Sequence, residues 1–272
     1  MSARAGRFSD AAISIFVRRL ALLLQDLGFA PADIEANTAA IRLLLGSGRR
    51  EALLATGAFL ERRDIARRWN AILSVERGPF LGRLVGPHVV GSILDLLSGN
   101  GSVARFLERS TGAEVATVER LGHDSGCISA GATRDFDDFQ SAPSDAAYDT
   151  VLLCTVLHHE WAPVTLLDLA ARVARRRIIL VENCIDDDCP AECHELVDLI
   201  FNDSLNKTSL PCPGSHRSLA EWLAMGAQYG EAKAVASVPS APGIPLSHDV
   251  IVIERGPCSF ISASTASPSR AA

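Results

Sequence analysis

The chain has 272 residues, 48% of them hydrophobic, so it can bury a sizeable core and is not an intrinsically disordered chain. Its formal net charge of −6 argues against a general nucleic-acid-binding protein, which would carry a basic excess. No segment is apolar and long enough to predict a secretory signal or a membrane span, so we expect a cytoplasmic protein with no membrane partner.

The first 86 residues are predicted to be helical throughout. Apolar residues recur at helical spacing, as at Ile13, Phe16, Val17 and Leu20, and glycine and proline separate one segment from the next. No run rich in β-forming residues interrupts them. This region, residues 1–86, is expected to act as a lid over a binding site or as a dimerisation region, which leaves a homodimer open.

From residue 87 to 256 the pattern changes to short apolar runs separated by helical stretches. The first four runs lie at residues 89–97, 115–118, 150–154 and 177–181. Apolar strands that alternate with helices are typical of a parallel α/β sheet. Two later strands, 234–238 and 249–254, leave no room for a helix between them, which predicts an antiparallel pair. An insertion at 186–214 and a flexible tail at 257–272 complete the predicted organisation.

A turn that contains glycine follows the first of these strands, within residues 94–101. Gly99 and Gly101 allow the backbone to approach a ligand closely, and the next helix offers free N–H groups at its start. A nucleotide-like ligand is therefore expected at the carboxyl end of this strand. The glycines also fit a dinucleotide fingerprint, with Glu119 at about 20 residues' distance, so an NAD(P)-dependent oxidoreductase is an alternative.

Asp95 favours a different ligand. It lies inside the strand, where a dinucleotide-binding fold normally has an apolar residue. A buried carboxylate is costly unless it has a partner, and either the glycine loop or a cationic ligand would supply one. The absence of a helix between the two terminal strands also argues against a dinucleotide-binding fold.

With these features in place, residues 94–101 resemble the first motif of class I S-adenosylmethionine-dependent methyltransferases. Residues 118–119 resemble their second strand with its acidic ribose ligand, and residues 134–136 resemble the segment that holds the adenine in small-molecule O-methyltransferases. Residues 152–159 resemble the fourth strand and the loop after it. The resemblance implies a Rossmann-like seven-stranded sheet, mostly parallel with an antiparallel last strand, and S-adenosyl-L-methionine as the cofactor. The cofactor ligands that it implies are Asp95, Ser98, Gly99, Gly101, Glu119, Asp135, Phe136 and Cys154.

Two features depart from the family pattern. Leu97 stands where the loop should have its first glycine, and it is expected to crowd the cofactor or shift its contacts. The segment between Glu119 and Asp135 is short and rich in glycine, which predicts an abbreviated second helix. A non-catalytic, methyltransferase-like partner protein is therefore a further alternative.

His158 and His159 follow a predicted central strand, at the edge where open α/β sheets bind ligands. Histidine suits the role of general base for a hydroxyl acceptor, and the resemblance to the His-Asp-Trp loop of some O-methyltransferases favours His158. A structural role for both histidines stays open. Trp161 and Glu182 are predicted to contact the substrate, whereas His216 is a weaker candidate to face the site.

Several cysteines and a histidine invite the hypothesis of a zinc site: Cys184, Cys189, Cys193, His194 and Cys212. Their spacing lacks the paired Cys-x2-Cys form that makes such a prediction strong. We interpret them as ordinary reduced thiols and predict no metal site.

The predicted function is S-adenosylmethionine-dependent methylation of a small molecule, at a hydroxyl, in secondary metabolism. N- or C-methylation by the same fold, an NAD(P)-dependent oxidoreductase and a non-catalytic partner protein are the alternatives. The expected partner is a small-molecule substrate and not a nucleic acid.

Overall fold

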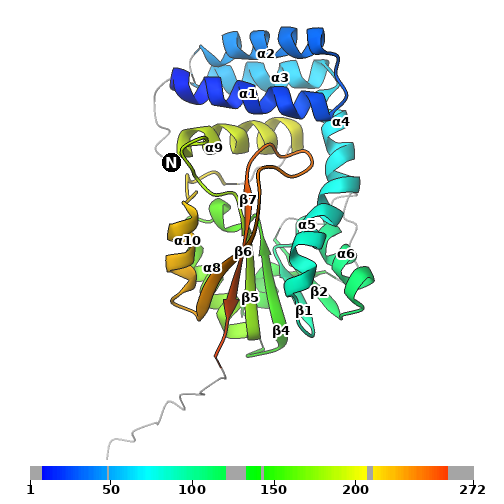
Figure 1. The fold of residues 1–272 in the computed structure, drawn as a ribbon, viewed down its shortest axis with the longest axis vertical. Helices are drawn as coiled ribbons and strands as arrows, with labels where there is room; N and C mark the ends of the chain where they lie inside the picture. The colour runs from blue at the N-terminus through cyan, green and yellow to red at the C-terminus, as the bar shows by residue number, and fades with distance from the viewer. Residues whose placement is uncertain (1–7, 48, 121–132, 142–143, 207–210, 257–272) are drawn as a thin grey trace, which may run out of the picture.

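The structure, a computed structural model, describes residues 8–47, 49–120, 133–141, 144–206 and 211–256. Within these ranges a layer of helices stands over one edge of a twisted β-sheet (Figure 1). None of the described helices is long and apolar enough to cross a membrane.

The N-terminal region is helical, as its periodicity predicted. Ser9 caps the first helix by accepting a hydrogen bond from the backbone N–H of Ala12 at 3.1 Å, and Pro31 stands in the first turn of the second helix. The elements are α1 (Asp10–Asp26), α2 (Pro31–Leu45), α3 (Arg49–Arg62), α4 (Ile65–Ile72), the π-helix η1 (Leu73–Arg77), α5 (Gly78–Val85) and the 3-10 turn η2 (Gly86–His88). Whether this region serves as a lid or as a dimerisation region stays a prediction.

A seven-stranded sheet follows, in the order β3-β2-β1-β4-β5-β7-β6. Only β7 runs antiparallel to its neighbours, and a tight turn bridged by Ala241 and Ile244 joins it to β6. The predicted fold class is therefore confirmed. The strands are β1 (Ile93–Leu96), β2 (Val115–Glu119), β3 (Arg134–Asp135), β4 (Tyr148–Cys154), β5 (Ala174–Glu182), β6 (Glu231–Val238) and β7 (His248–Glu254).

Within the apolar run at 89–97, the first strand occupies Ile93–Leu96, and a turn precedes it. Gly91 has a φ of +57°, and a Cβ at that position would meet the side chain of Asp149. The same carboxylate accepts a hydrogen bond from the Ser92 N–H at 3.1 Å, which fixes a turn before the strand. The predicted abbreviated helix between Glu119 and Asp135 and the predicted flexible tail fall largely or wholly outside the described residues.

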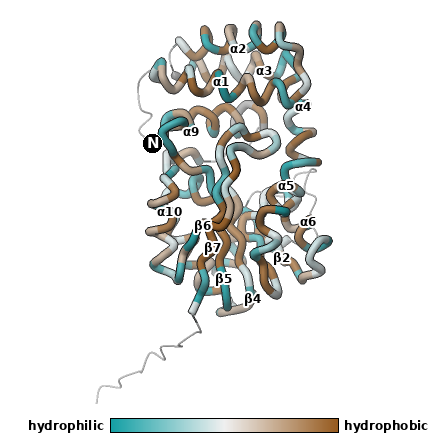
Figure 2. Tube along the Cα trace, viewed as in Figure 1, coloured by the Kyte–Doolittle hydropathy of each residue, from teal (hydrophilic) through white to brown (hydrophobic). Residues whose placement is uncertain are grey.

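Helices cover the sheet and connect its parallel strands. The helices are α6 (Ser102–Thr111), α7 (Phe136–Ser141), α8 (Pro163–Val173) and α10 (Leu219–Gly226), with a 3-10 turn η3 (Leu157–His159) after β4. Figure 2 shows hydrophobic residues concentrated along the central strands between these helices. Burial on both faces explains why the strands read as uninterrupted apolar runs in the sequence.

The insertion forms α9 (Ala191–Asp198), which continues directly into the π-helix η4 (Leu199–Asn206). Its apolar side packs against the N-terminal helices, so that Leu24 of α1 and Leu196 of α9 belong to one buried cluster. Trp69 of α4 adds a hydrogen bond from its indole N–H to the Gly243 carbonyl at 2.6 Å. The N-terminal helices and the insertion therefore form one helical lobe, which lies above the carboxyl ends of the parallel strands (Figure 1).

The site follows from the strand order. The chain leaves β1 on one side to form β2 and returns to its other side with β4, so the order reverses between β1 and β4. Ligands bind outside the carboxyl ends of the strands at such a switch point. Asp95 pairs in register with Leu152, which brings the loop after β1 next to the loop after β4.

Candidate active site

The loop after β1 is held in an unusual backbone conformation. Leu97, Gly99 and Gly101 all lie in the left-handed region, with φ of 62°, 57° and 72°. A leucine in this region costs about 1–2 kcal/mol, and such strain is typical of functional sites. A Cβ placed on Gly99 would meet nothing within 4 Å, so open space adjoins the loop. The glycine predicted to face a ligand therefore does border free space.

Glu119 ends β2 directly beside this loop. Its Oε2 accepts a hydrogen bond from the Gly99 N–H at 2.5 Å, and its Oε1 accepts one from the Arg120 N–H at 2.7 Å. The structure thus brings the predicted ribose ligand and the glycine loop together, although they are 20 residues apart in the sequence.

Asp95 is buried, with 1% of its surface exposed, and neither carboxylate oxygen makes a well-formed hydrogen bond to a described residue, although the backbone N–H of Ala104 interacts with the carboxylate. Burial, reinforced by the nearby charge of Glu119, raises its pKa to about 7. A buried carboxylate with so little compensation is costly, so a cationic partner from outside the chain would stabilise it. A cationic ligand at the glycine loop fits this requirement, as would the ammonium group of S-adenosylmethionine.

The predicted adenine contacts lie where β3 passes into α7, with Asp135 at the end of the strand and Phe136 at the start of the helix. Asp135 is exposed, and its Oδ1 accepts hydrogen bonds from the N–H groups of Asp137 and Asp138 at 2.8 and 3.2 Å, which caps α7. Phe136 is buried under the guanidinium of Arg120, 4.5 Å from the ring centroid. Phe136 and Arg120, together with side chains of α8, line a pocket of about 310 Å³. Contact of Asp135 and Phe136 with adenine stays a prediction.

Cys154 and Thr155 close the other side of the switch point. Thr155 has a φ of 56°, so the ends of β1 and β4 each carry a left-handed residue that is not glycine. Arg77 of η1 donates a hydrogen bond to the Thr155 hydroxyl at 3.0 Å, and its Nε is buried without a partner among the described residues. Burial raises the pKa of the Cys154 thiol to about 12, so this thiol is neutral. Sequence reasoning missed Arg77, because it lies in the helical region far from every motif.

Glu182 ends β5 and holds the loop after β4. Its Oε1 accepts hydrogen bonds from the N–H groups of Val156 and Leu157 at 3.1 and 2.8 Å, and its Oε2 lies 2.6 Å from Nδ1 of His158. In the neutral imidazole this contact places the proton on Nδ1 and leaves the lone pair on Nε2. Glu182 has no exposed surface. Its predicted contact with substrate stays a prediction.

The two adjacent histidines are in different environments. Burial opposes the charged form of His158, but the carboxylates of Glu182 and Asp198 outweigh it and raise the pKa to about 9. Burial and the neighbouring His158 lower the pKa of His159 to about 4. Nδ1 of His159 lies 2.9 Å from the Pro211 carbonyl oxygen, which leaves its Nε2 with a lone pair.

Trp161, predicted to line the acceptor pocket, follows this loop with 69% of its surface exposed. It is one of the most exposed large hydrophobic side chains among the described residues. Its contact with an acceptor stays a prediction.

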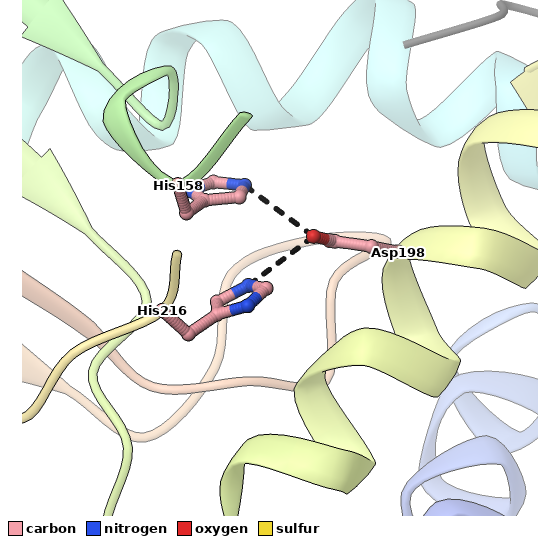
Figure 3. Close-up of side chains that lie close together, drawn as sticks. All are labelled: His158, Asp198 and His216. Atoms are coloured by element: carbon pink, nitrogen blue, oxygen red, sulfur yellow. Dashed lines mark ion pairs between the residues drawn. The ribbon is translucent and has the colours of Figure 1, made fainter. Parts of the chain in front are cut away.

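Asp198 and His216 complete the cluster around His158. Asp198 is the last residue of α9, and its Oδ2 lies 3.2 Å from Nε2 of His216 and 3.9 Å from Nε2 of His158 (Figure 3). The rings of His158 and His216 stack at 4.8 Å. His216 had been a weaker candidate, whereas Asp198 was missed. Its only sequence signal is an acidic residue between Val197 and Leu199 in an apolar helix.

The sequence cluster of cysteines does not coincide with this group. Cys184, Cys189 and Cys193 are buried free thiols. In the described part of the chain, metal-ligating atoms converge in two sets, His158 with Asp198 and His216, and His159 with Asp198 and Cys212. Of the five residues singled out in the sequence, only Cys212 takes part in either set.

Comparison with known proteins places these features in context. No family model matches the chain. In sequence it is 29% identical over 163 residues to the O-methyltransferase penK of Penicillium thymicola, a match that covers 55% of this chain and 36% of that relative. The chain thus spans about a third of the relative's length. Among solved structures, it is similar to the mitomycin 7-O-methyltransferase MmcR (19% identity, TM-score 0.47, 71% of this chain and 57% of that one). It is also similar to the pyocyanin biosynthetic protein PhzM (19% identity, TM-score 0.46, 76% and 64%).

The strand order and the sequence similarity lead to one class. The sheet, with its single antiparallel strand and its glycine loop after β1, has the architecture that the motifs predicted. The relative in sequence is an O-methyltransferase. The chain therefore resembles the class I S-adenosylmethionine-dependent methyltransferases, and within them the small-molecule O-methyltransferases.

Proposed function

We propose that the protein is an S-adenosylmethionine-dependent methyltransferase that acts on a hydroxyl group of a small molecule. The observation that carries the proposal is the carboxylate of Asp95, buried without a well-formed hydrogen bond at the end of β1, directly before an open glycine loop. The pair of His158 and Glu182 supports it, because the pair lies at the end of the adjacent strand. The resemblance to small-molecule O-methyltransferases favours an acceptor from secondary metabolism.

The residues around the switch point would each contact a different part of the cofactor. Asp95 would face the cationic methionine end, and Glu119 would accept hydrogen bonds from the ribose hydroxyls. The loop at Ser98, Gly99 and Gly101 lets the backbone approach the ligand. Asp135 and Phe136 would border the adenine, with Cys154 on the opposite wall. When bound, the cofactor supplies an electrophilic methyl group.

On the acceptor side, the chain must position a hydroxyl, take up its proton and exclude water. In its neutral form each of His158 and His159 has an Nε2 lone pair, because the Nδ1 of each ring is held by a fixed acceptor. His159, with a pKa of about 4, is neutral at pH 7, whereas His158, with a pKa of about 9, must first lose its second proton. The helical lobe covers the carboxyl ends of the strands (Figure 1). We propose it as the lid that removes water, since positioning and a dry site supply much of the rate.

Calorimetry tests the cofactor directly. S-adenosylmethionine and its demethylated product should each bind the full chain with one site, and a nicotinamide dinucleotide should not bind. Binding of the dinucleotide alone would replace the proposal with the oxidoreductase. Binding of neither cofactor would favour a non-catalytic partner protein.

Kinetics of two variants test the acceptor chemistry. His158→Ala and His159→Ala remove the two candidate bases, and general-base catalysis typically contributes about 10²–10⁴-fold. At least one variant should lose tenfold or more in kcat with little change in cofactor affinity. A smaller loss in both would speak against base-assisted O-methylation and for an N- or C-methyl acceptor.

Gly99→Ala is expected to weaken cofactor binding about tenfold or more while it destabilises the protein by only about 1 kcal/mol. The new methyl group meets no protein atom within 4 Å, so its only cost in the free protein is the backbone conformation. It would project into the space proposed for the cofactor. Calorimetry and thermal melting measure the two effects.

Gly112→Ala is the matched control for this experiment. Gly112 has a φ of +69°, also meets nothing within 4 Å, and ends α6 away from the loop. It should lose the same stability and keep full cofactor affinity. Equal affinities in the two variants would contradict the placement of the cofactor at Gly99.

A further inference from the structure

We propose that His158, Asp198 and His216 hold a divalent transition-metal ion of the zinc type, and that the oxygen of the methyl acceptor binds this ion. The inference on the acceptor rests on the proposed methyl transfer, whereas the metal site itself rests on the three side chains alone. Figure 3 shows both imidazoles directed at one carboxylate oxygen of Asp198.

The spacing of the ligand atoms suits a metal ion. Bonds of about 2.0–2.1 Å in a tetrahedral site place neighbouring ligand atoms about 3.3 Å apart. Nε2 of His216 lies 3.2 Å from Oδ2 of Asp198, and Nε2 of His158 lies 3.9 Å from the same oxygen. All three ligand atoms lie within 4.8 Å of one another. A small side-chain rotation of His158 would complete the site.

The same atoms lack other partners. All three residues are more than nine-tenths buried, with 3%, 7% and 8% of their surfaces exposed. Oδ2 of Asp198 and Nε2 of His216 form an ion pair at 3.2 Å, and neither these two atoms nor Nδ1 of His216 makes a well-formed hydrogen bond to another described residue. Buried polar atoms without partners are rare and costly. A cation between them would satisfy the carboxylate and two imidazoles at once.

The surroundings of the site resemble those of known metal ligands. Nδ1 of His158 contacts Glu182, and a metal-binding histidine typically donates its second N–H to a carboxylate in this way. Asp198 lies where α9 changes into a π-helix, a distortion that is frequent at functional sites. The backbone bond from the Ile185 N–H to the Arg217 carbonyl fixes the segment that carries His216.

The second converging set gives the ion further neighbours. His159 and Cys212 share Asp198 with the first set, so a fourth ligand or an exchangeable position lies on that side. Two histidines and one carboxylate leave coordination positions open, as in catalytic metal sites. The acceptor oxygen would take an open position.

This arrangement assigns separate roles to the two adjacent histidines. With its Nε2 bound to the ion, His158 is a ligand, and His159 receives the proton of the acceptor hydroxyl. The O–H bond breaks, the oxygen forms a bond to the methyl carbon, and the bond from that carbon to sulfur breaks.

Metal binding by the full chain tests the proposal without reference to activity. The protein is stripped with a chelator and titrated with Co²⁺ and Zn²⁺, with visible absorption for the first and calorimetry for the second. We expect one equivalent of each to bind. His216→Ala should weaken Zn²⁺ binding about 100-fold or more, since loss of an outer contact alone typically costs 10–100-fold.

Two further variants keep the test decisive. Asp198→Asn, nearly isosteric, should show the same loss if His216→Ala does not fold by circular dichroism. His88→Ala removes a histidine outside the cluster and should retain full metal binding. No stoichiometric metal in the wild-type protein, or unchanged binding in both cluster variants, would overturn the site. S-adenosylmethionine affinity, measured on the same samples, tests the proposed function separately.

Discussion

Asp95→Asn is expected to make the ligand-free protein more stable and to weaken cofactor binding. In the folded protein the buried carboxylate has a pKa of about 7, raised from an ordinary value of 3.8 by burial and by Glu119. Ionised Asp95 therefore opposes folding at neutral pH, and an amide removes that charge. We expect a gain of about 1–3 kcal/mol, which corresponds to about 2–4 °C of melting temperature for each kcal/mol.

The pH dependence of the protein's stability should also reflect the ionisation of Asp95. Between pH 4 and 7 the unfolded chain has lost the Asp95 proton while the folded protein still holds it, so this group makes stability fall as pH rises. Above pH 7 both states are ionised and its contribution becomes constant. Asp95→Asn should remove this decline from a series of melting curves.

Cofactor binding should respond in the opposite direction. If Asp95 faces the cationic end of the cofactor, affinity rises as pH rises through about 7, because the carboxylate becomes charged. Asp95→Asn should lower the affinity about 30–100-fold, the cost of a lost charge-assisted contact, and remove the pH dependence. Calorimetry between pH 5.5 and about 8.5 covers the transition.

Asp149→Asn is the matched control. Hydrogen bonds from Ser92, together with Arg175, hold the pKa of Asp149 below its usual range, so the same substitution should destabilise the protein slightly. Asp149 lies at the start of β4, away from the cofactor loop, and affinity should not change. A loss of stability in Asp95→Asn together with unchanged affinity would refute the role given to Asp95.

The architecture was predictable because its signals are local. Strands buried on both faces form continuous apolar runs, and the short gap before β7 excluded a helix, so the sheet and its antiparallel strand followed directly. Residues 89–92 of the first apolar run precede β1 and turn at Gly91, and this turn depends on Asp149, which is distant in the sequence. β3, with two residues, is too short to give a periodic signal.

Some residues of the candidate site could likewise be predicted from local motifs, whereas others could not. The contact of Glu119 with Gly99 followed from a motif with fixed spacing. Arg77 and Asp198 belong to helices of the lobe and reach the strand ends only through tertiary packing, for which a single sequence has no pattern. The packing of the insertion on α1 could not be predicted from the sequence either, because both segments are amphipathic and neither pattern indicates which segment covers it.

Glu182→Gln should lower kcat about 10²–10⁴-fold with little change in cofactor affinity. A glutamine can still accept the hydrogen bonds from Val156 and Leu157, so the loop after β4 should keep its conformation. Its amide would face Nδ1 of His158, however, and would move the ring proton to Nε2. Nε2 of His158, proposed as a candidate base or as a metal ligand, then has no lone pair, and a wrong tautomer of this kind costs about 10⁴-fold in an analogous catalytic histidine.

Glu254→Gln controls for the loss of a sheet-end carboxylate. Glu254 ends β7 at the opposite edge of the sheet, where its carboxylate pairs with Arg177. Its amide variant should lose stability and keep kcat. If Glu182→Gln retains wild-type kcat, the proton on His158 is irrelevant to the reaction. If kcat and Zn²⁺ affinity fall together, the lone pair of His158 acts through the proposed metal ion, because loss of such an outer carboxylate typically weakens metal binding 10–100-fold.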